Sequence, residues 1–124
     1  MPVAVADASA LAAVAFGEAE GPAVAARLAP ATLVAPALVW FEMASVCLAK
    51  IRRQPREADR LLRALGKALR VPIEIHEVDH LAVVSLARDA GLSAYDASYL
   101  WLSRRLGAEL VTLDRALDAA SRRP

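Results

Sequence analysis

The chain has 124 residues, of which 57% are hydrophobic and 23% are charged, and its formal net charge is +1. This length allows one domain with its own core and is too short for two, so we expect a single domain over residues 1–124. The apolar content excludes a disordered tail, and the single cysteine excludes an internal disulfide and a zinc site built from cysteines.

The first predicted elements are short strands and helices in alternation. Residues 3–6 form an apolar run that predicts a buried strand, and either Asp7 or Ser9 can cap a helix directly after it. Pro22 can begin a helix that runs to residue 28. Residues 32–35 predict a second strand.

Two long helices and a third strand follow. The helices are predicted over residues 37–53 and 56–69, because Pro55 breaks the helical pattern between them. Residues 73–75 alternate between isoleucine and glutamate and predict a short strand.

The last third of the chain predicts two helices, a strand and a final helix. They cover residues 79–90, 94–106, 110–113 and 115–121, and a glycine follows each of the first two helices. The alternation along the whole chain predicts an α/β fold: a three-layer α/β/α sandwich with a mainly parallel sheet of four or five strands.

Nothing in the sequence suggests a membrane protein. The N-terminus lacks basic residues, so we recognise no secretory signal. Residues 29–49 are rich in apolar side chains, but Pro30, Pro36 and Glu42 interrupt them. We expect a soluble cytoplasmic protein.

Four acidic residues stand out from this pattern. Asp7 and Asp114 follow predicted strands, and the carboxyl ends of parallel strands meet at the edge of the sheet where ligands bind. Glu42 lies in an apolar stretch, so its carboxylate needs a cation, a hydrogen-bond donor or a proton, although an ion pair with an arginine would also explain it. Asp96 lies near a helix N-terminus, where an interaction with the helix dipole is the structural alternative.

One shared pocket explains all four acids together. Clustered carboxylates repel one another unless a cation neutralises them. Mg²⁺ or Mn²⁺ suits a site made only of oxygen ligands, and such an ion can activate water and stabilise charge on a phosphate oxygen. The four acids therefore suit metal-dependent chemistry at a phosphate group.

Four segments, each with one of these acids, carry a family resemblance. They are VADASAL at 5–11, WFEMASV at 40–46, GLSAYDASYL at 91–100 and GAELVTLD at 107–114. In order and spacing, over nearly the whole chain, they resemble the PIN-domain nucleases and, among these, the VapC-type toxins of toxin–antitoxin pairs.

The resemblance implies a single PIN-like nuclease domain over residues 1–124 that acts as a metal-dependent endoribonuclease. It places one or two Mg²⁺ or Mn²⁺ ions among four ligands that are also the catalytic acids: Asp7, Glu42, Asp96 and Asp114. It implies that Ser9 and Thr112 assist by hydrogen bonding. It also implies a homodimer and a small antitoxin that covers the groove and places an arginine in the acidic pocket.

Two further expectations concern the end of the chain. Asp118 lies one helical turn after Asp114, so it is either a supporting acid behind the site or a solvated surface residue. Many relatives continue into another short strand, whereas this chain stops at residue 124, so the sheet is expected to lack that strand.

Basic residues are concentrated in one region. Residues 50–70 contain eight bases and two acids, a net charge of +6, and the rest of the chain carries −5. We predict that Arg52, Arg53 and Arg56 bind RNA phosphates, although a solvated helix face explains them equally well. Apolar faces of the two long helices are candidate contact surfaces for a partner.

The remaining notable side chains have structural interpretations. We interpret His76 and His80 as structural or surface residues and Cys47 as a small core residue. Four aromatic residues are expected in the core or at an interface rather than as platforms for bases: Trp40, Tyr95, Tyr99 and Trp101.

Two other functions compete with an active ribonuclease. A phosphatase-type α/β hydrolase would usually carry a second acid two residues after its nucleophilic aspartate, and Ser9 occupies that position here. A catalytically inert PIN-like binding module is the other alternative, and the presence of all four acids favours activity.

Overall fold

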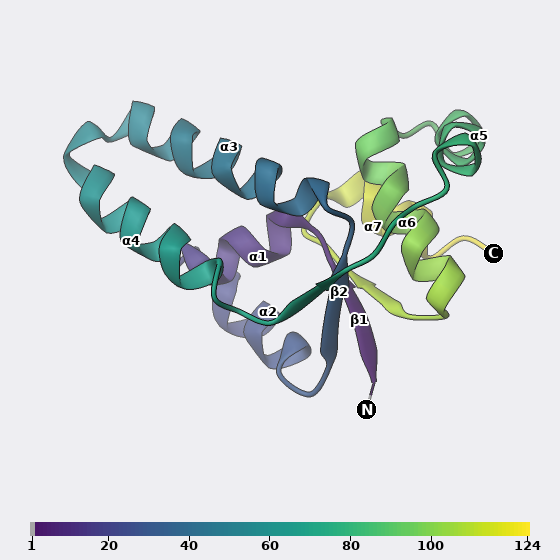
Figure 1. Ribbon diagram of the computed structural model, residues 1–124, viewed down its shortest axis with the longest axis horizontal. Coiled ribbons are helices and arrows are strands. Elements are labelled where there is room, and N and C mark those ends of the chain that lie inside the picture. Colours follow the sequence, from purple (N-terminus) through teal and green to yellow (C-terminus); the bar gives the residue numbers. More distant parts are fainter. Residues whose placement is uncertain (1) are drawn as a thin grey trace.

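The computed structural model describes residues 2–124 and contains one parallel sheet of four strands. The strands lie in the order β3-β2-β1-β4 (Figure 1). Their bounds are β1 (Val3–Ala6), β2 (Thr32–Ala35), β3 (Ile73–Ile75) and β4 (Glu109–Val111). All three pairings are parallel.

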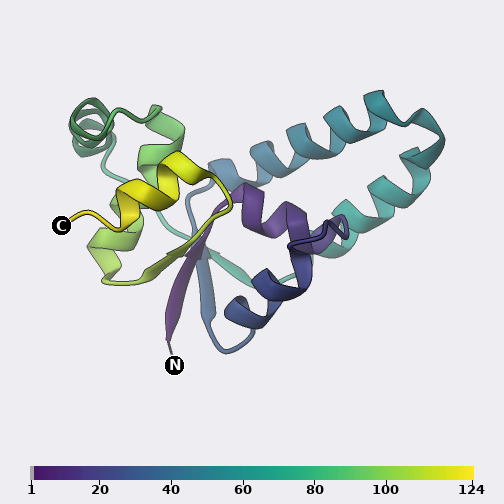
Figure 2. The same cartoon turned by 180° about the vertical axis from the view of Figure 1, so that it is seen from behind.

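Helices cover both faces of this sheet, so the predicted three-layer α/β/α sandwich is confirmed. One group comprises α1 (Ala8–Ala15), α2 (Gly21–Leu28), α3 (Leu38–Arg53) and α4 (Ala58–Ala68), with the short 3₁₀ turn η1 (Pro55–Glu57) before α4. The other comprises α5 (His80–Ala90), α6 (Ala94–Leu106) and α7 (Arg115–Ser121). Figures 1 and 2 show the two groups on opposite sides of the strands.

The burial of strand β1 agrees with a sheet that is covered on both faces. Ala4, Val5 and Ala6 of β1 are all buried, so both faces of this strand meet apolar side chains. Such a continuous apolar run is typical of a parallel strand covered on both sides.

The sheet topology creates a crevice beside β1. After β1 the chain adds β2 and β3 on one side of it, and then adds β4 on the other side. Ligands of open α/β sheets bind at such a reversal, outside the carboxyl ends of the strands. Asp7 follows β1 directly and therefore lies at this crevice.

The long helix α3 is anchored by one apolar stripe. Val39, Met43 and Cys47 recur every fourth residue and are buried. Cys47 donates a hydrogen bond from its thiol to the carbonyl of Leu61 at 3.7 Å, and burial raises the pKa of this thiol. It is a small core residue, as predicted. The α3–α4 hairpin extends away from the sheet (Figure 1).

The last strand ends earlier than predicted. The sequence pattern placed it over residues 110–113, but β4 ends at Val111. The N–H of Leu113 donates to Ser9 Oγ at 2.9 Å, and that of Asp114 donates to Thr112 Oγ1 at 3.0 Å. Side chains therefore satisfy these amides in place of a neighbouring strand.

None of the helices within residues 2–124 is both long and apolar enough to cross a membrane.

Candidate active site

A cavity of about 590 Å³ lies at the crevice, and all four predicted acids line it. The acids come from four separate parts of the fold: the end of β1, α3, the start of α6 and the start of α7. Its wall therefore combines Asp7, Glu42, Asp96 and Asp114 with apolar side chains from α3 and α6.

Asp7 is the most deeply placed of these acids, with only 4% of its surface exposed. Its Oδ1 accepts hydrogen bonds from Ser9 Oγ at 2.7 Å and from the N–H of Ala10 at 3.0 Å. Its Oδ2 accepts one from Thr112 Oγ1 at 2.5 Å. Asp7 is thus both the N-cap of α1 and a carboxylate with fixed orientation.

Ser9 and Thr112 connect Asp7 to the loop after β4. Each hydroxyl accepts a hydrogen bond from a loop N–H, of Leu113 or Asp114, and donates its own proton to the carboxylate of Asp7. The predicted hydrogen bonding of these two residues beside an acid is therefore present. Their contribution to catalysis stays a prediction.

Glu42 has a partner that the sequence analysis did not identify. The hydroxyl of Tyr99 donates to Glu42 Oε1 at 2.5 Å, and Tyr99 itself is only 1% exposed. Within residues 2–124 no basic side chain forms an ion pair with Glu42, so the arginine alternative is wrong. Glu42 is partly exposed rather than fully buried, because its carboxylate faces the cavity.

Tyr99 is a core residue, as predicted, and it also reaches the site. It lies three residues after Asp96 in α6, so the two side chains share one side of the helix and both line the cavity. That spacing was the signal in the sequence that could have linked Tyr99 to the acids.

Asp96 and Asp114 both lie where helices begin. The N–H of Asp96 donates to Ser93 Oγ at 3.1 Å in the first turn of α6, so the predicted position near a helix N-terminus is confirmed. Asp114 is the N-cap of α7 and accepts a hydrogen bond from the N–H of Leu117 at 2.8 Å. Asp96 and Asp114 therefore each lie at the N-terminus of a helix and also line the cavity.

Burial and mutual repulsion raise the pKa of three of the acids. For Asp7, burial raises the pKa most, and Asp114 adds to this, while the hydrogen bonds from Thr112, Ser9 and Ala10 oppose it. For Glu42, burial again dominates and Asp7 and Asp96 add to it, while the hydrogen bond from Tyr99 lowers the pKa.

Asp96 responds to the same neighbours. Burial raises its pKa, the charges of Asp114 and Asp7 raise it further, and the hydrogen bond with Ser93 has the opposite effect. The four carboxylates are therefore electrostatically coupled, and a cation in the cavity would relieve their repulsion.

The acids match a divalent cation in donor type and charge. Oxygen ligands are what Mg²⁺ and Mn²⁺ prefer, and Mg²⁺ usually keeps several of its waters. Among residues 2–124, however, no three His, Cys, Asp or Glu side chains converge into a ready-made set of metal ligands. Direct contact of one ion with three carboxylates would therefore require some of these side chains to move.

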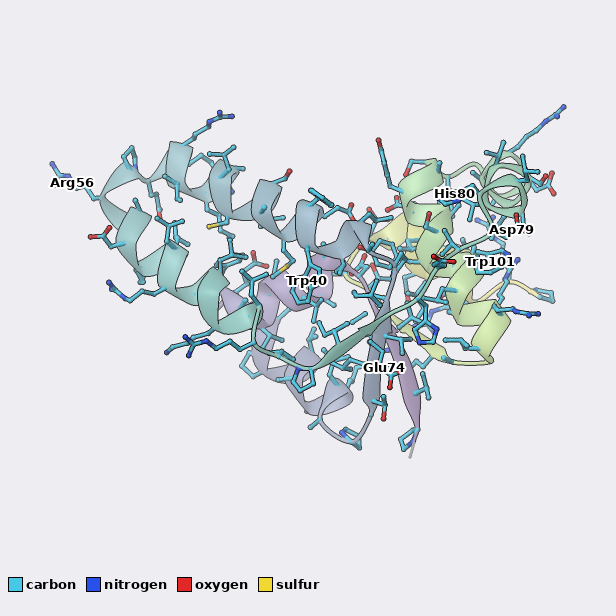
Figure 3. The ribbon with its side chains drawn as sticks, in the orientation of Figure 1. Trp40, Arg56, Glu74, Asp79, His80 and Trp101 are labelled. Atoms are coloured by element: carbon cyan, nitrogen blue, oxygen red, sulfur yellow. The ribbon has the colours of Figure 1, made fainter. Side chains whose placement is uncertain are left out.

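Several other predicted residues lie outside this cavity. Asp118 does not line it, and its Oδ2 accepts a hydrogen bond from Arg122 Nε at 3.1 Å. Arg52, Arg53 and Arg56 are exposed at the far end of the α3–α4 hairpin, where Figure 3 shows Arg56 at the tip. His76 Nε2 lies 3.3 Å from Glu74 Oε2, and this contact agrees with a surface role for His76.

The aromatic residues separate into two groups. Trp40 and Trp101 are partly buried and pack against the core, as expected. Tyr95 is 67% exposed and lines the acidic cavity, so it is not a core residue, and the alternative expectation of an interface stays a prediction.

A larger cavity of about 1000 Å³ lies elsewhere, and none of the four acids lines it. Its wall is mainly apolar and comes from the four helices α1–α4 and the segments around β2 and β3, with Arg60, Arg63 and Lys67 among its charged side chains. Its composition fits a contact surface better than a site for chemistry.

Comparison with solved structures gave two informative similarities. The crystal structure of PAE2754 from Pyrobaculum aerophilum is 27% identical in sequence with a TM-score of 0.78, and the match covers 98% of this chain and 87% of that one. VapC20 from Mycobacterium tuberculosis, described as a toxin that cleaves the sarcin-ricin loop, is 17% identical with a TM-score of 0.67. That match covers 98% of this chain and 99% of VapC20 and shows a shared fold. A comparison with curated proteins gave no significant match.

The family comparison agrees with the fold and with the four segments. The model of the PIN domain matches residues 4–123, which is nearly the whole chain. The resemblance to the PIN-domain proteins is therefore confirmed, and the chain belongs to the PIN domain family.

Proposed function

We propose that this protein is a Mg²⁺- or Mn²⁺-dependent endoribonuclease and the toxin of a type II toxin–antitoxin pair. Its family membership supports a nuclease. The observation that carries the finer proposal is the single cavity at the edge of the sheet that Asp7, Glu42, Asp96 and Asp114 line together. The shared fold with VapC20, which is described as a toxin that cleaves the sarcin-ricin loop, supports the toxin role by analogy.

The side chains around the cavity would have different roles in cleavage. The four acids would hold the cation, which when bound neutralises negative charge during cleavage of the phosphodiester. Ser9 and Thr112 would keep Asp7 ionised and in place, because both donate hydrogen bonds to its carboxylate. Tyr99 would do the same for Glu42.

RNA cleavage with and without EDTA tests this proposal. We expect wild-type protein to cleave single-stranded RNA with Mg²⁺ or Mn²⁺ and to lose that activity in EDTA. Asp7→Asn and Asp96→Asn should each lower cleavage by about 100-fold or more, because each removes a charge from the cation site. The matched control is Asp89→Asn, which removes the same charge from an exposed position on α5.

The variants also define what would contradict the proposal. Undiminished cleavage by Asp7→Asn or Asp96→Asn would show that the cavity is not the active site. Cleavage that persists in EDTA would refute the metal dependence. Equal loss in Asp89→Asn would show that the charge change acts through the whole protein rather than through the cavity.

We also propose a homodimer and an antitoxin as partners. The larger cavity supports a protein partner, because its apolar wall is accompanied by the basic residues Arg60, Arg63 and Lys67, which suit an amphipathic segment with acidic side chains. A small adjacent gene with a DNA-binding motif would identify the candidate antitoxin. Its purified product should bind this protein and abolish cleavage, and sedimentation of the protein alone should give the mass of a dimer.

A further inference from the structure

Two exposed aromatic side chains flank the acidic cavity. Phe41 on α3 is 77% exposed and directly precedes Glu42, while Tyr95 on α6 is 67% exposed and directly precedes Asp96. Both line the same cavity as the four acids. We propose that Phe41 and Tyr95 stack on unpaired bases of the RNA next to the phosphate that is cleaved. This inference rests on the proposed ribonuclease function and adds to it the residues that would bind the bases beside the cleaved bond.

The size of the cavity leaves room for more than a cation. An ion with six waters occupies roughly 200 Å³, at about 30 Å³ per water. The cavity measures about 590 Å³, so most of its volume is available to another group. Besides the acids, its wall contains Leu38, Phe41, Val46 and Tyr95, which offer apolar surface.

The chemistry of that wall matches a nucleotide in a single strand. The acids with a cation suit the phosphate, and flat aromatic faces suit the base attached to it. Aromatic stacking contributes to binding of any base and is tolerant of sequence. Bases of a duplex are already stacked and paired, so their faces cannot reach these side chains unless the strand opens.

Fold stability does not explain the two aromatic residues. The side of α3 that is buried carries Val39, Met43 and Cys47, so Phe41 contributes little to the core. Phe41 and Tyr95 both line the cavity and are still largely exposed, so each presents ring surface to a group that enters it. Contact with a second copy of the chain is the alternative use of such surface, and it predicts a different result in the experiment below.

The test compares alanine variants with conservative variants on three RNA substrates. The variants are Phe41→Ala and Tyr95→Ala, with Phe41→Trp and Tyr95→Phe as replacements that keep an aromatic ring. Leu81→Ala is the control, because Leu81 is 84% exposed on α5 and lines neither cavity. The substrates are an RNA oligomer that the wild-type protein cleaves, the same oligomer annealed to its complement, and a version without the bases beside the cleaved bond.

We expect each alanine variant to lower kcat/KM for the single strand by about 5- to 100-fold, mainly through KM. Phe41→Trp and Tyr95→Phe should restore most of the activity that the alanine variants lose, and Leu81→Ala should match wild type. Wild-type protein should cleave the annealed and the base-free oligomers poorly, and the alanine variants should lose little further activity on the base-free one.

Three results would overturn the inference. If wild type cleaves RNA but the alanine variants match it, the aromatic residues do not bind bases and the ribonuclease proposal stands alone. If the alanine variants sediment as smaller species than wild type and lose activity on all substrates equally, the aromatic residues serve contact with a second copy. If the search for the first substrate finds no RNA oligomer that wild type cleaves, the proposed function fails as well.

Discussion

Asp7 and Glu42 line the same cavity, but they differ in the number of hydrogen bonds that their carboxylates accept. Asp7 accepts hydrogen bonds from two hydroxyls and one backbone amide, and both of its oxygens are engaged. Glu42 accepts a hydrogen bond from Tyr99 alone among the side chains around it. The hydrogen bond from Tyr99 favours the ionised form of Glu42 against burial and the charges of Asp7 and Asp96, which makes Tyr99 a positioning residue that can be tested.

Replacement of Tyr99 by phenylalanine should shift the pH dependence of cleavage. The hydrogen bond from Tyr99 lowers the pKa of Glu42, so its loss should raise that pKa further. Activity should then fall at a higher pH on the acidic side of the profile, with kcat about tenfold lower near neutral pH. The buried ring is retained, so circular dichroism should be unchanged. An acidic limb at the same pH in both proteins would contradict the role assigned to Tyr99.

The coupled acids should also make the metal-free protein sensitive to pH. The pKa of Asp96 is raised above its ordinary value of 3.8 in the folded protein, so the folded state binds more protons than the unfolded state. The contribution of Asp96 to the free energy of unfolding therefore decreases as the pH rises from its ordinary pKa of 3.8 through its raised pKa in the folded state.

Asp96→Asn should accordingly stabilise the protein in EDTA at pH 7. The gain over wild type should disappear as the pH falls well below 3.8, where Asp96 is protonated in both the folded and the unfolded state. Thermal unfolding followed by circular dichroism at several pH values measures this difference. Saturating Mg²⁺ should reverse the order of the two proteins, because only wild type keeps the complete cation site. A constant difference at every pH would exclude the electrostatic cause.

The sequence allowed part of this site to be predicted at the level of residues. Asp7 could be identified because it follows a short apolar strand, and Glu42 because it interrupts an apolar helix. The bond between Tyr99 and Glu42 could not, since the two residues are 57 positions apart and meet only when α3 and α6 are placed in the fold. A tyrosine within an apolar helix has the same local pattern whether or not its hydroxyl reaches an acid.

Helices α1 and α2 approach each other closely at Gly21. Gly21 begins α2, and a Cβ atom at this position would lie 2.5 Å from the carbonyl oxygen of Ala13 in α1. The backbone conformation of Gly21 is not the left-handed one, so close approach of the helices rather than a special turn requires glycine here.

Gly21→Ala should therefore lower the free energy of unfolding by about 1–3 kcal/mol, because the methyl group meets backbone that cannot simply rotate away. Gly66→Ala is the matched control in the exposed interior of α4, where a Cβ atom would meet nothing within 4 Å. It should raise the free energy of unfolding by about 0.5–1 kcal/mol through helix propensity. Chemical denaturation measures both values, and equal effects of the two substitutions would contradict the close approach.

Element boundaries were predictable where the local sequence determines them. The helix after Asp79 begins with that residue as its cap and ends at Gly91, which adopts the left-handed conformation. The end of β4 was missed because Thr112 and Leu113 have strand-like side chains, yet their segment is held by Ser9 from the start of the chain. A contact between residues more than 100 positions apart leaves no mark on local periodicity.

At the scale of the whole molecule, acidic and basic regions lie at the two ends of α3. Glu42 lies near its start in the acidic cavity, and Arg52 and Arg53 lie at its end, about 15 Å farther along at 1.5 Å per residue. Figure 3 shows Arg56 at the tip of the same hairpin. An RNA strand engaged at the cavity could therefore extend along α3 to this basic tip, where its phosphates would find positive charge.

Neutralising this tip should weaken RNA binding in a manner that depends on salt. The triple variant Arg52→Gln, Arg53→Gln and Arg56→Gln should raise Kd for single-stranded RNA and make the plot of log Kd against log salt concentration less steep. The slope should fall by about 0.7 for each phosphate that the protein no longer neutralises, or by about 2 for three phosphates. Arg88→Gln, Arg104→Gln and Arg105→Gln together form the control, since they remove the same charge from exposed positions on α5 and α6. If both triple variants change the slope equally, net charge alone governs binding, and if neither does, the basic tip does not contact the RNA.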